Sequence, residues 1–221
     1  MELTRLTRQR ATDEVYQALR QSILAHVFAP GERLQVEDIA SKLGVSLTPV
    51  RHAIQQLAAE GLIEIRPRSG TFVAKLTARD VEETADIRCA LECLAAESAI
   101  ERTTDHQIAE LRALVAHIAA PVASDADRKR HEHDNLAFHR LLIEYSGNRR
   151  LAEMYGTLNA HLQIARVHLQ ESDWEKRLEV ERTEHEAIVD ALASRELSRL
   201  IAALRAHILR ARQSLAAGLR Q

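Results

Sequence analysis

Two groups of side chains in this sequence have the types and the spacing to do chemistry. The first group, the polar series, consists of Thr48, Arg51, His52 and Gln55 together with one apolar residue, Leu47. Arg51 can hydrogen-bond to guanine edges or to phosphate, and Thr48 can bond phosphate or touch a thymine methyl group. On one face of a helix, this series would suit the major groove of DNA. A basic turn, Arg66-Pro67-Arg68-Ser69-Gly70, follows and could approach the DNA backbone or the minor groove, with Gly70 allowing a close turn.

The second group is the histidines, of which the chain has eleven. An isolated histidine is more often a hydrogen-bonded core residue or a surface residue than a ligand, so the count alone assigns no function. No HExxH motif is present, and Glu184-His185-Glu186 by itself supplies no clear general base. A metalloenzyme built on the histidines is therefore an alternative with little support from the sequence.

The front of the chain has the pattern of a winged helix-turn-helix. Apolar residues recur at helical spacing over 11–27, and Pro30-Gly31 ends that helix. A second apolar face over 36–43 stops at Gly44, and Ser46 can cap a third helix that runs to about residue 60. Two β-rich runs at 62–66 and 71–75 predict a hairpin. Three helices followed by a hairpin place the polar series on the second helix of a helix-turn-helix.

The rear of the chain predicts helices only. Thr77 and Asp80 can cap a new helix, so we expect a domain boundary between residues 76 and 77. The expected helices span about 79–101, 104–119, 126–146, 148–170, 174–193 and 196–217. The predicted fold is mainly α: a winged helix-turn-helix over 1–76, and an antiparallel bundle of about six helices over 77–221.

Composition sets limits on the partners and the compartment. Residues 1–76 hold ten Lys and Arg against eight Asp and Glu, whereas residues 77–221 hold twenty against twenty-four. The front is thus slightly basic within a chain of net charge −2. Two cysteines, Cys89 and Cys93, suggest no disulfide framework, and we expect a reducing cytoplasm. No stretch is long and apolar enough for a membrane span, and no signal peptide is visible.

The front segment resembles a known family of bacterial regulators. PGERLQVEDIASKLGVSLTPVRHAIQQLAAEGLIEIRPRSGTFV is similar to the GntR family, above all in LGVSLTPVR and in the wing with GTFV, and the resemblance covers about residues 12–74. It implies binding of operator DNA. Two positions depart from the family pattern: Leu47 stands where Arg is usual, and His52 where Glu is usual. The predicted DNA-binding residues are Arg33, Leu47, Thr48, Arg51, His52, Gln55, Arg68 and Gly70.

The rear domain resembles the FCD sensor domain of FadR-like members of that family. The matching stretches are IRCALECLAAESA (87–99), NLAFHRLLIEYSGNRRL (135–151), EHEAIVDAL (184–192) and the run around His207. The resemblance implies a divalent metal, Zn²⁺ or Ni²⁺, held by Asn135, His139, His185 and His207. Asn135 replaces the usual Asp and brings no charge, so we expect weaker binding. Asp134 lies about 140° round the helix from His139 and is a poor substitute.

The same resemblance implies a small carboxylate effector. Arg88 and, less strongly, Arg166 are the candidate contacts, with Glu92 at i+4 as an alternative, purely structural partner for Arg88. His161 is a third candidate, because it could line the same cavity. His168, seven residues further along the same expected helix, could line that cavity with it. Structural or surface roles are assigned to five others: His26, His106, His117, His131 and His133.

The sequence therefore predicts a cytoplasmic, homodimeric transcription regulator that is not an enzyme. It would bind a near-palindromic operator, and effector binding would change the spacing of its two DNA-binding heads. Apart from the metalloenzyme, one alternative stays open. It is a protein-interaction module that has lost DNA binding, which Leu47 makes conceivable.

Overall fold

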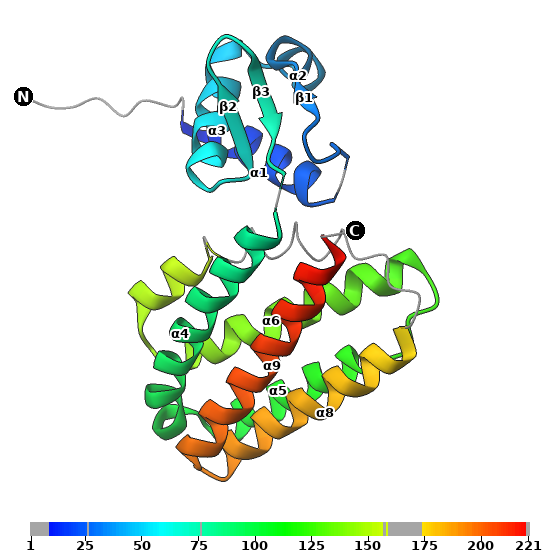
Figure 1. Ribbon diagram of the computed structural model, residues 1–221. Helices are drawn as coiled ribbons and strands as arrows, with labels where there is room; N and C mark the ends of the chain where they lie inside the picture. Colours follow the sequence, from blue (N-terminus) through cyan, green and yellow to red (C-terminus); the bar gives the residue numbers. More distant parts are fainter. Residues whose placement is uncertain (1–8, 26, 76, 157, 159–173, 220–221) are drawn as a thin grey trace, which may run out of the picture. The chain divides into compact units, whose positions relative to one another are not determined.

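The computed structural model comprises residues 1–221 and describes residues 9–25, 27–75, 77–156, 158 and 174–219. The chain divides into two compact units, residues 1–76 and 77–221. Figure 1 shows a small mixed unit at the start of the chain and a helical unit after it. The predicted mainly α fold, with a winged helix-turn-helix followed by a helical bundle, is confirmed.

The front unit contains three helices and a small sheet. The helices are α1 (Gln9–Leu24), α2 (Val36–Leu43) and α3 (Leu47–Ala59). The apolar faces of α1 and α3 pack against each other through residues such as Val15, Leu19, Val50 and Leu57, which are at most 4% exposed. Gly44 ends α2 in the left-handed conformation that its lack of a Cβ permits.

The sheet contains one strand that the periodicity does not predict. β2 (Ile63–Arg66) and β3 (Gly70–Val73) form the expected hairpin, and β1 (Arg33–Leu34) pairs antiparallel with the other edge of β3. β1 has only two residues, too few for an alternating pattern. Its formation depends on the free edge of β3, which is a tertiary feature. The sheet order is β1-β3-β2.

The rear unit is entirely helical among its described residues. It contains α4 (Ala78–Arg102), α5 (Asp105–Ile118), α6 (Asp125–Tyr145), a helix over 149–156, α8 (Trp174–Ala193) and α9 (Leu197–Gly218). Capping boxes at Thr77, Thr104 and Ser124 start the first three helices of this unit. Each hydroxyl accepts a hydrogen bond from the backbone N–H three residues later, and the side chain of that later residue accepts one from the backbone N–H of the capping residue. The rest of the helix expected over 148–170 lies outside the described residues.

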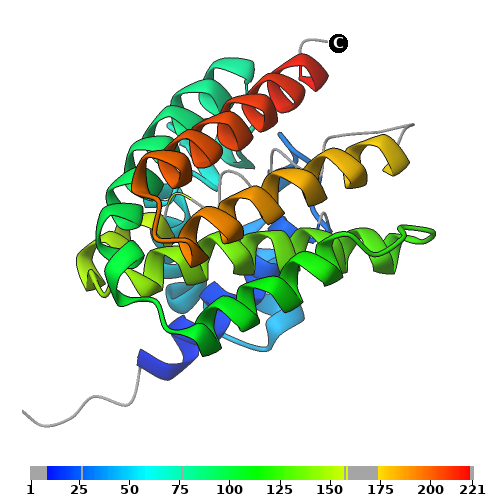
Figure 2. The same ribbon diagram turned by 90° about the horizontal axis from the view of Figure 1, so that it is seen from below.

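The helices of the rear unit pack in a closed ring. α4 packs against α9 and α6, α9 against α8, α8 against α5, and α5 against α6. Figure 2 shows α5, α6, α8 and α9 running side by side. Phe138, Leu142, Ile188, Leu192 and Leu204 fill much of the interior and are inaccessible to solvent. No helix within the described ranges is long and apolar enough to cross a membrane.

Candidate metal centre and nucleic-acid interface

The second helix of the helix-turn-helix, α3, has one buried face and one exposed face. Val50, Ala53, Ile54 and Leu57 are buried. The five predicted DNA-contacting residues of this helix are all exposed on the other side: Leu47, Thr48, Arg51, His52 and Gln55. Ser46 occupies the N-cap position as expected, but its side chain makes no capping hydrogen bond. The start of α3 therefore offers polar groups to a ligand.

The wing holds arginines on two of its strands and on the turn of its hairpin. Arg33 of β1 lies across Gly70, since a Cβ added at Gly70 would lie 2.9 Å from Arg33 Nε. The guanidinium of Arg66 lies 4.6 Å above the Phe72 ring. Arg68 is exposed at the tip with a φ of 63°. The structure thus places the predicted Arg33 against Gly70, with Arg66 and Arg68 on the same hairpin.

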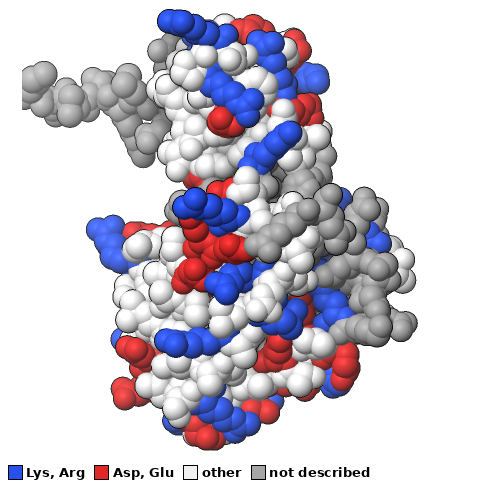
Figure 3. All heavy atoms as spheres, in the orientation of Figure 1, with Lys and Arg blue, Asp and Glu red and all other residues white. Residues whose placement is uncertain are grey.

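The charge on the visible surface is mixed rather than uniformly basic. Figure 3 shows Lys and Arg side chains interspersed with Asp and Glu on the face in view. A wide basic field would attract any DNA through its phosphates. With mixed charge, any recognition of DNA would depend more on the exposed face of α3 and the wing arginines.

The interior of the rear unit brings three of the four predicted metal ligands together. His139 of α6, His185 of α8 and His207 of α9 are each at most 1% exposed. One ring nitrogen of each lies within 4.8 Å of those of the other two. These three residues, the histidine triad, come from three different helices, so the packing of the helices positions them.

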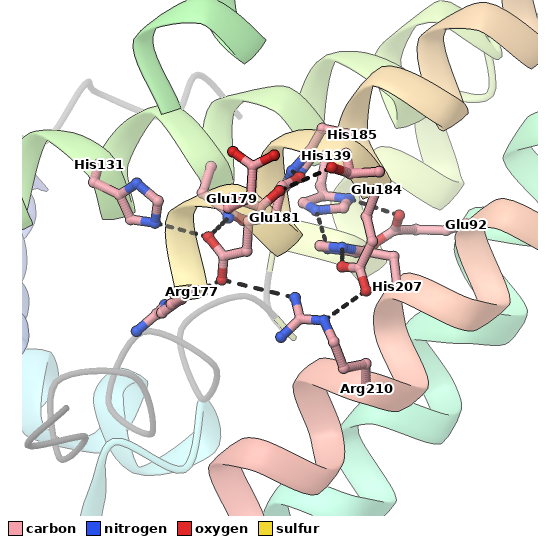
Figure 4. A network of polar contacts seen from close by, with 12 residues as sticks. Glu92, His131, His139, Arg177, Glu179, Glu181, Glu184, His185, His207 and Arg210 are labelled. Atoms are coloured by element: carbon pink, nitrogen blue, oxygen red, sulfur yellow. Dashed lines mark hydrogen bonds and ion pairs between the residues drawn. The ribbon is translucent and has the colours of Figure 1, made fainter. Parts of the chain in front are cut away.

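The Nδ1 atom of each triad histidine is held by an oxygen. His139 Nδ1 lies 2.8 Å from Glu92 Oε2, and His207 Nδ1 lies 2.8 Å from Glu184 Oε2. His185 Nδ1 lies 2.6 Å from the backbone carbonyl of Glu181. Each Nδ1 is therefore placed to donate its proton to an oxygen, and in a neutral ring this puts the lone pair on Nε2. Figure 4 shows these contacts converging on the triad.

This tautomer makes the triad suitable for a cation. The Nε2 atoms of His139 and His207 are 3.1 Å apart, so both would lie close to an ion held by the triad. Burial, followed by the charge of Arg88, lowers the pKa of His207 to about 3, which keeps its ring neutral. A buried set of imidazoles with anchored Nδ1 atoms is the donor set that Zn²⁺ and Ni²⁺ take in proteins. The residues present therefore fit such an ion.

The fourth predicted ligand, Asn135, is fully buried one helical turn before His139. Its Nδ2 atom donates to Glu181 Oε2 at 3.4 Å, and its amide oxygen is the neutral atom that could reach a metal. Asp134 is engaged elsewhere, because its Oδ2 lies 3.9 Å from His117 Nδ1 of α5. That Asp134 does not replace the missing carboxylate stays a prediction.

Several buried polar residues around the triad could not be assigned from the sequence. Glu181 accepts from Arg177 Nε at 2.9 Å and lies 2.8 Å from the ring of His131. His131, assigned a structural role, is buried and also contacts the carbonyl of Ile118. Arg210 donates to Glu184 Oε1 at 2.6 Å. These contacts leave little signal in the sequence, because only the tertiary fold brings α6, α8 and α9 together.

Arg88, a predicted effector contact, is 2% exposed and lies beside the triad. Its Nε donates to Glu92 Oε1 at 2.6 Å, so the structural partner considered for it is present. Its Nη2 is buried without a hydrogen-bond partner among the described residues. Burial lowers the pKa of Arg88, but Glu92 and Tyr155 together, by charge and hydrogen bonding, outweigh it and hold the pKa above its usual value. The other two candidates, Arg166 and His161, lie outside the described residues.

The chain matches two family models and many regulators. Residues 11–73 match "Bacterial regulatory proteins, gntR family", and residues 83–210 match the FCD domain. The HTH-type transcriptional regulator YdhC of Bacillus subtilis is 30% identical over 70% of this chain and 69% of its own. The "Probable D-xylose utilization operon transcriptional repressor" of Paenarthrobacter nicotinovorans is 31% identical over 85% of this chain and 81% of its own.

A solved structure has the same fold. The crystal structure of a transcriptional regulator GntR from Rhodococcus sp. RHA1 covers 95% of this chain and 99% of its own, with a TM-score of 0.80 at 23% identity. The families and these relatives are transcriptional regulators, which sets the metalloenzyme alternative aside. The chain belongs to the GntR family of bacterial transcription regulators and carries an FCD domain behind its DNA-binding head.

Proposed function

We propose that this regulator binds a near-palindromic operator as a homodimer, and that a divalent metal and a small organic acid in the rear unit change its DNA affinity. The observation that carries the proposal is the buried, convergent histidine triad together with the buried Arg88. Neither a neutral buried triad nor a buried guanidinium with an unbonded Nη2 is needed to stabilise a helical core.

The residues of the rear unit would have separate roles in binding the metal and the effector. His139, His185 and His207 would hold the ion, with the Asn135 oxygen as a neutral fourth ligand. The bound ion would supply a Lewis-acidic position for a second oxygen of the effector, apart from the carboxylate at Arg88. Arg88 would pair with the effector carboxylate through its Nη2, and Glu92 would keep the guanidinium in place. α4 and α9 pack against each other, so a ligand that contacts both can shift their relative position.

In the front unit, α3 would enter the major groove and the wing would reach the adjacent backbone. Arg51 and Thr48 would contact bases and phosphates, and Arg33 and Arg68 would contact phosphates or the minor groove. Two-fold symmetry of a homodimer would be matched by two half-sites in the operator.

The ligand part is tested by metal analysis of the full chain together with DNA binding. We expect the wild type to bind one Zn²⁺ or Ni²⁺ per chain in equilibrium dialysis, and His139→Ala to lose it. His106→Ala, at an exposed histidine of α5, is the matched control and should keep the ion. Operator affinity is then measured with and without metal and a panel of organic acids. Wild-type protein that binds no ion, or whose DNA affinity responds to no ligand, would contradict the proposal.

A further inference from the structure

One carboxylate in the rear unit contacts both the histidine triad and Arg88. Glu92 Oε2 lies 2.8 Å from His139 Nδ1. Glu92 Oε1 accepts from Arg88 Nε at 2.6 Å and from the Tyr155 hydroxyl at 2.7 Å. Glu92 is inaccessible to solvent and Arg88 is 2% exposed, so water screens neither charge. His139, which would bind the metal, and Arg88, which would bind an anion, thus share Glu92 as a single buried counter-ion.

We propose that Glu92 couples these two sites, so that a divalent metal at the triad and a carboxylate at Arg88 each raise the affinity for the other. The inference rests on the function proposed above and assigns a role to a residue that neither metal nor effector would touch. Glu92 is a positioning residue, because it acts through His139 on one side and through Arg88 on the other.

The coupling follows from the competition for one charge. When His139 gives its Nε2 lone pair to a cation, its Nδ1–H becomes a stronger donor and binds Glu92 more tightly. Less of the Glu92 charge is then available to Arg88, whose buried guanidinium needs an anion. The Nη2 of Arg88 makes no hydrogen bond within the described residues, so an incoming carboxylate has a donor to bind. By linkage, a carboxylate on Arg88 releases Glu92 for His139 and strengthens metal binding by the same factor.

The chain supplies a matched control in Glu184. Its Oε2 lies 2.8 Å from His207 Nδ1, so it anchors a triad histidine as Glu92 does. Its Oε1 accepts from Arg210 rather than from Arg88. Figure 4 shows Glu92 and Glu184 each bonded to a triad histidine. Loss of either carboxylate should weaken metal binding, but only Glu92 connects the triad to Arg88.

The test is calorimetric titration of Zn²⁺ into the full chain, in chloride buffer and in acetate buffer of equal ionic strength. Acetate is the probe because it is a carboxylate that binds the free ion weakly. The ratio of the two dissociation constants measures the coupling. For the wild type, we expect acetate to tighten Zn²⁺ binding about tenfold, within the usual range for coupled sites. Glu92→Gln should weaken Zn²⁺ binding by about 10–100-fold and bring the ratio to about one. Glu184→Gln should weaken Zn²⁺ binding by about the same factor and keep the wild-type ratio.

Glu92→Gln leaves Arg88 buried without its counter-ion, so this variant could fail to fold. The double variant Arg88→Met with Glu92→Gln removes both charges together, and circular dichroism checks that it folds. It too should show a ratio of about one. Coupling that survives in either variant, or that Glu184→Gln also abolishes, would overturn the role of Glu92. A wild type that binds Zn²⁺ with no response to acetate would overturn the coupling alone. A wild type that binds no Zn²⁺ would overturn the proposed metal site as well.

Discussion

Leu47 is the first residue of α3, and it is an exposed apolar side chain on a face of polar ones. Its side chain is 36% exposed, beside Thr48 and Arg51 on the surface that would meet DNA. A leucine there can touch a thymine methyl group but cannot neutralise a phosphate. We therefore expect the identity of this residue to affect which operators the protein prefers and how strongly salt weakens the complex.

Replacing Leu47 by arginine tests this view of α3. Leu47→Arg adds a cation at the DNA surface, so we expect tighter operator binding and a slope of log affinity against log salt that steepens by about one. Fluorescence anisotropy over a salt series measures both quantities. Leu197→Arg, at a leucine of similar exposure (37%) in the rear unit, is the control and should leave the slope unchanged. An unchanged slope in Leu47→Arg would show that the start of α3 does not face DNA.

The histidine triad shows what residue types can and cannot indicate about a metal site. The identities of His139, His185 and His207 could be selected from the sequence because of the family resemblance. The partners that fix their tautomers could not, since Glu92 and Glu184 lie 47 and 23 residues away from the histidines they hold. Hydrogen bonds between distant helices leave no periodic signal in a sequence.

Among the elements, helix ends were easier to predict than the sheet. The capping boxes at Thr77, Thr104 and Ser124 lie within four residues of chain, so their chemistry is local. The hairpin of β2 and β3 is also local. β1 could not be predicted, because Arg33 and Leu34 become a strand only by pairing with Phe72 and Thr71. That pairing places Arg33 across the wing.

The wing depends on Gly70. Its φ of 126° is a conformation that L residues rarely adopt, and an added Cβ would lie 2.9 Å from Arg33 Nε. We expect Gly70→Ala to strain the wing by about 1–3 kcal/mol and to displace Arg33, so DNA affinity should fall by roughly tenfold or more. Zn²⁺ binding by the rear unit should not change. Ser69→Ala, at the exposed neighbouring residue, is the control. Wild-type DNA affinity in Gly70→Ala would argue against a role for the wing.

For the whole molecule, the proposal requires two heads on one operator. A single recognition helix reads only a few base pairs, so a homodimer would contact two half-sites separated by whole turns of DNA, about 10 base pairs or a multiple. We expect two chains per duplex in sedimentation velocity and two protected half-sites in a footprint. Inserting about five base pairs between the half-sites places them on opposite faces of the duplex. Affinity should then fall sharply, whereas equal affinity for a single half-site would contradict the dimer.

The sequence by itself determined the class of the fold and the face of α3 that is exposed. Both depend on periodicity and on turn chemistry, which act over a few residues. It also supplied the triad histidines and Arg88 through resemblance to a family. Only the tertiary structure decided that Arg33 crosses Gly70, that each triad Nδ1 is held by an oxygen, and that Glu92 contacts both His139 and Arg88. The physical reason is that these contacts join segments far apart in the chain, and packing of whole helices and strands sets their distances.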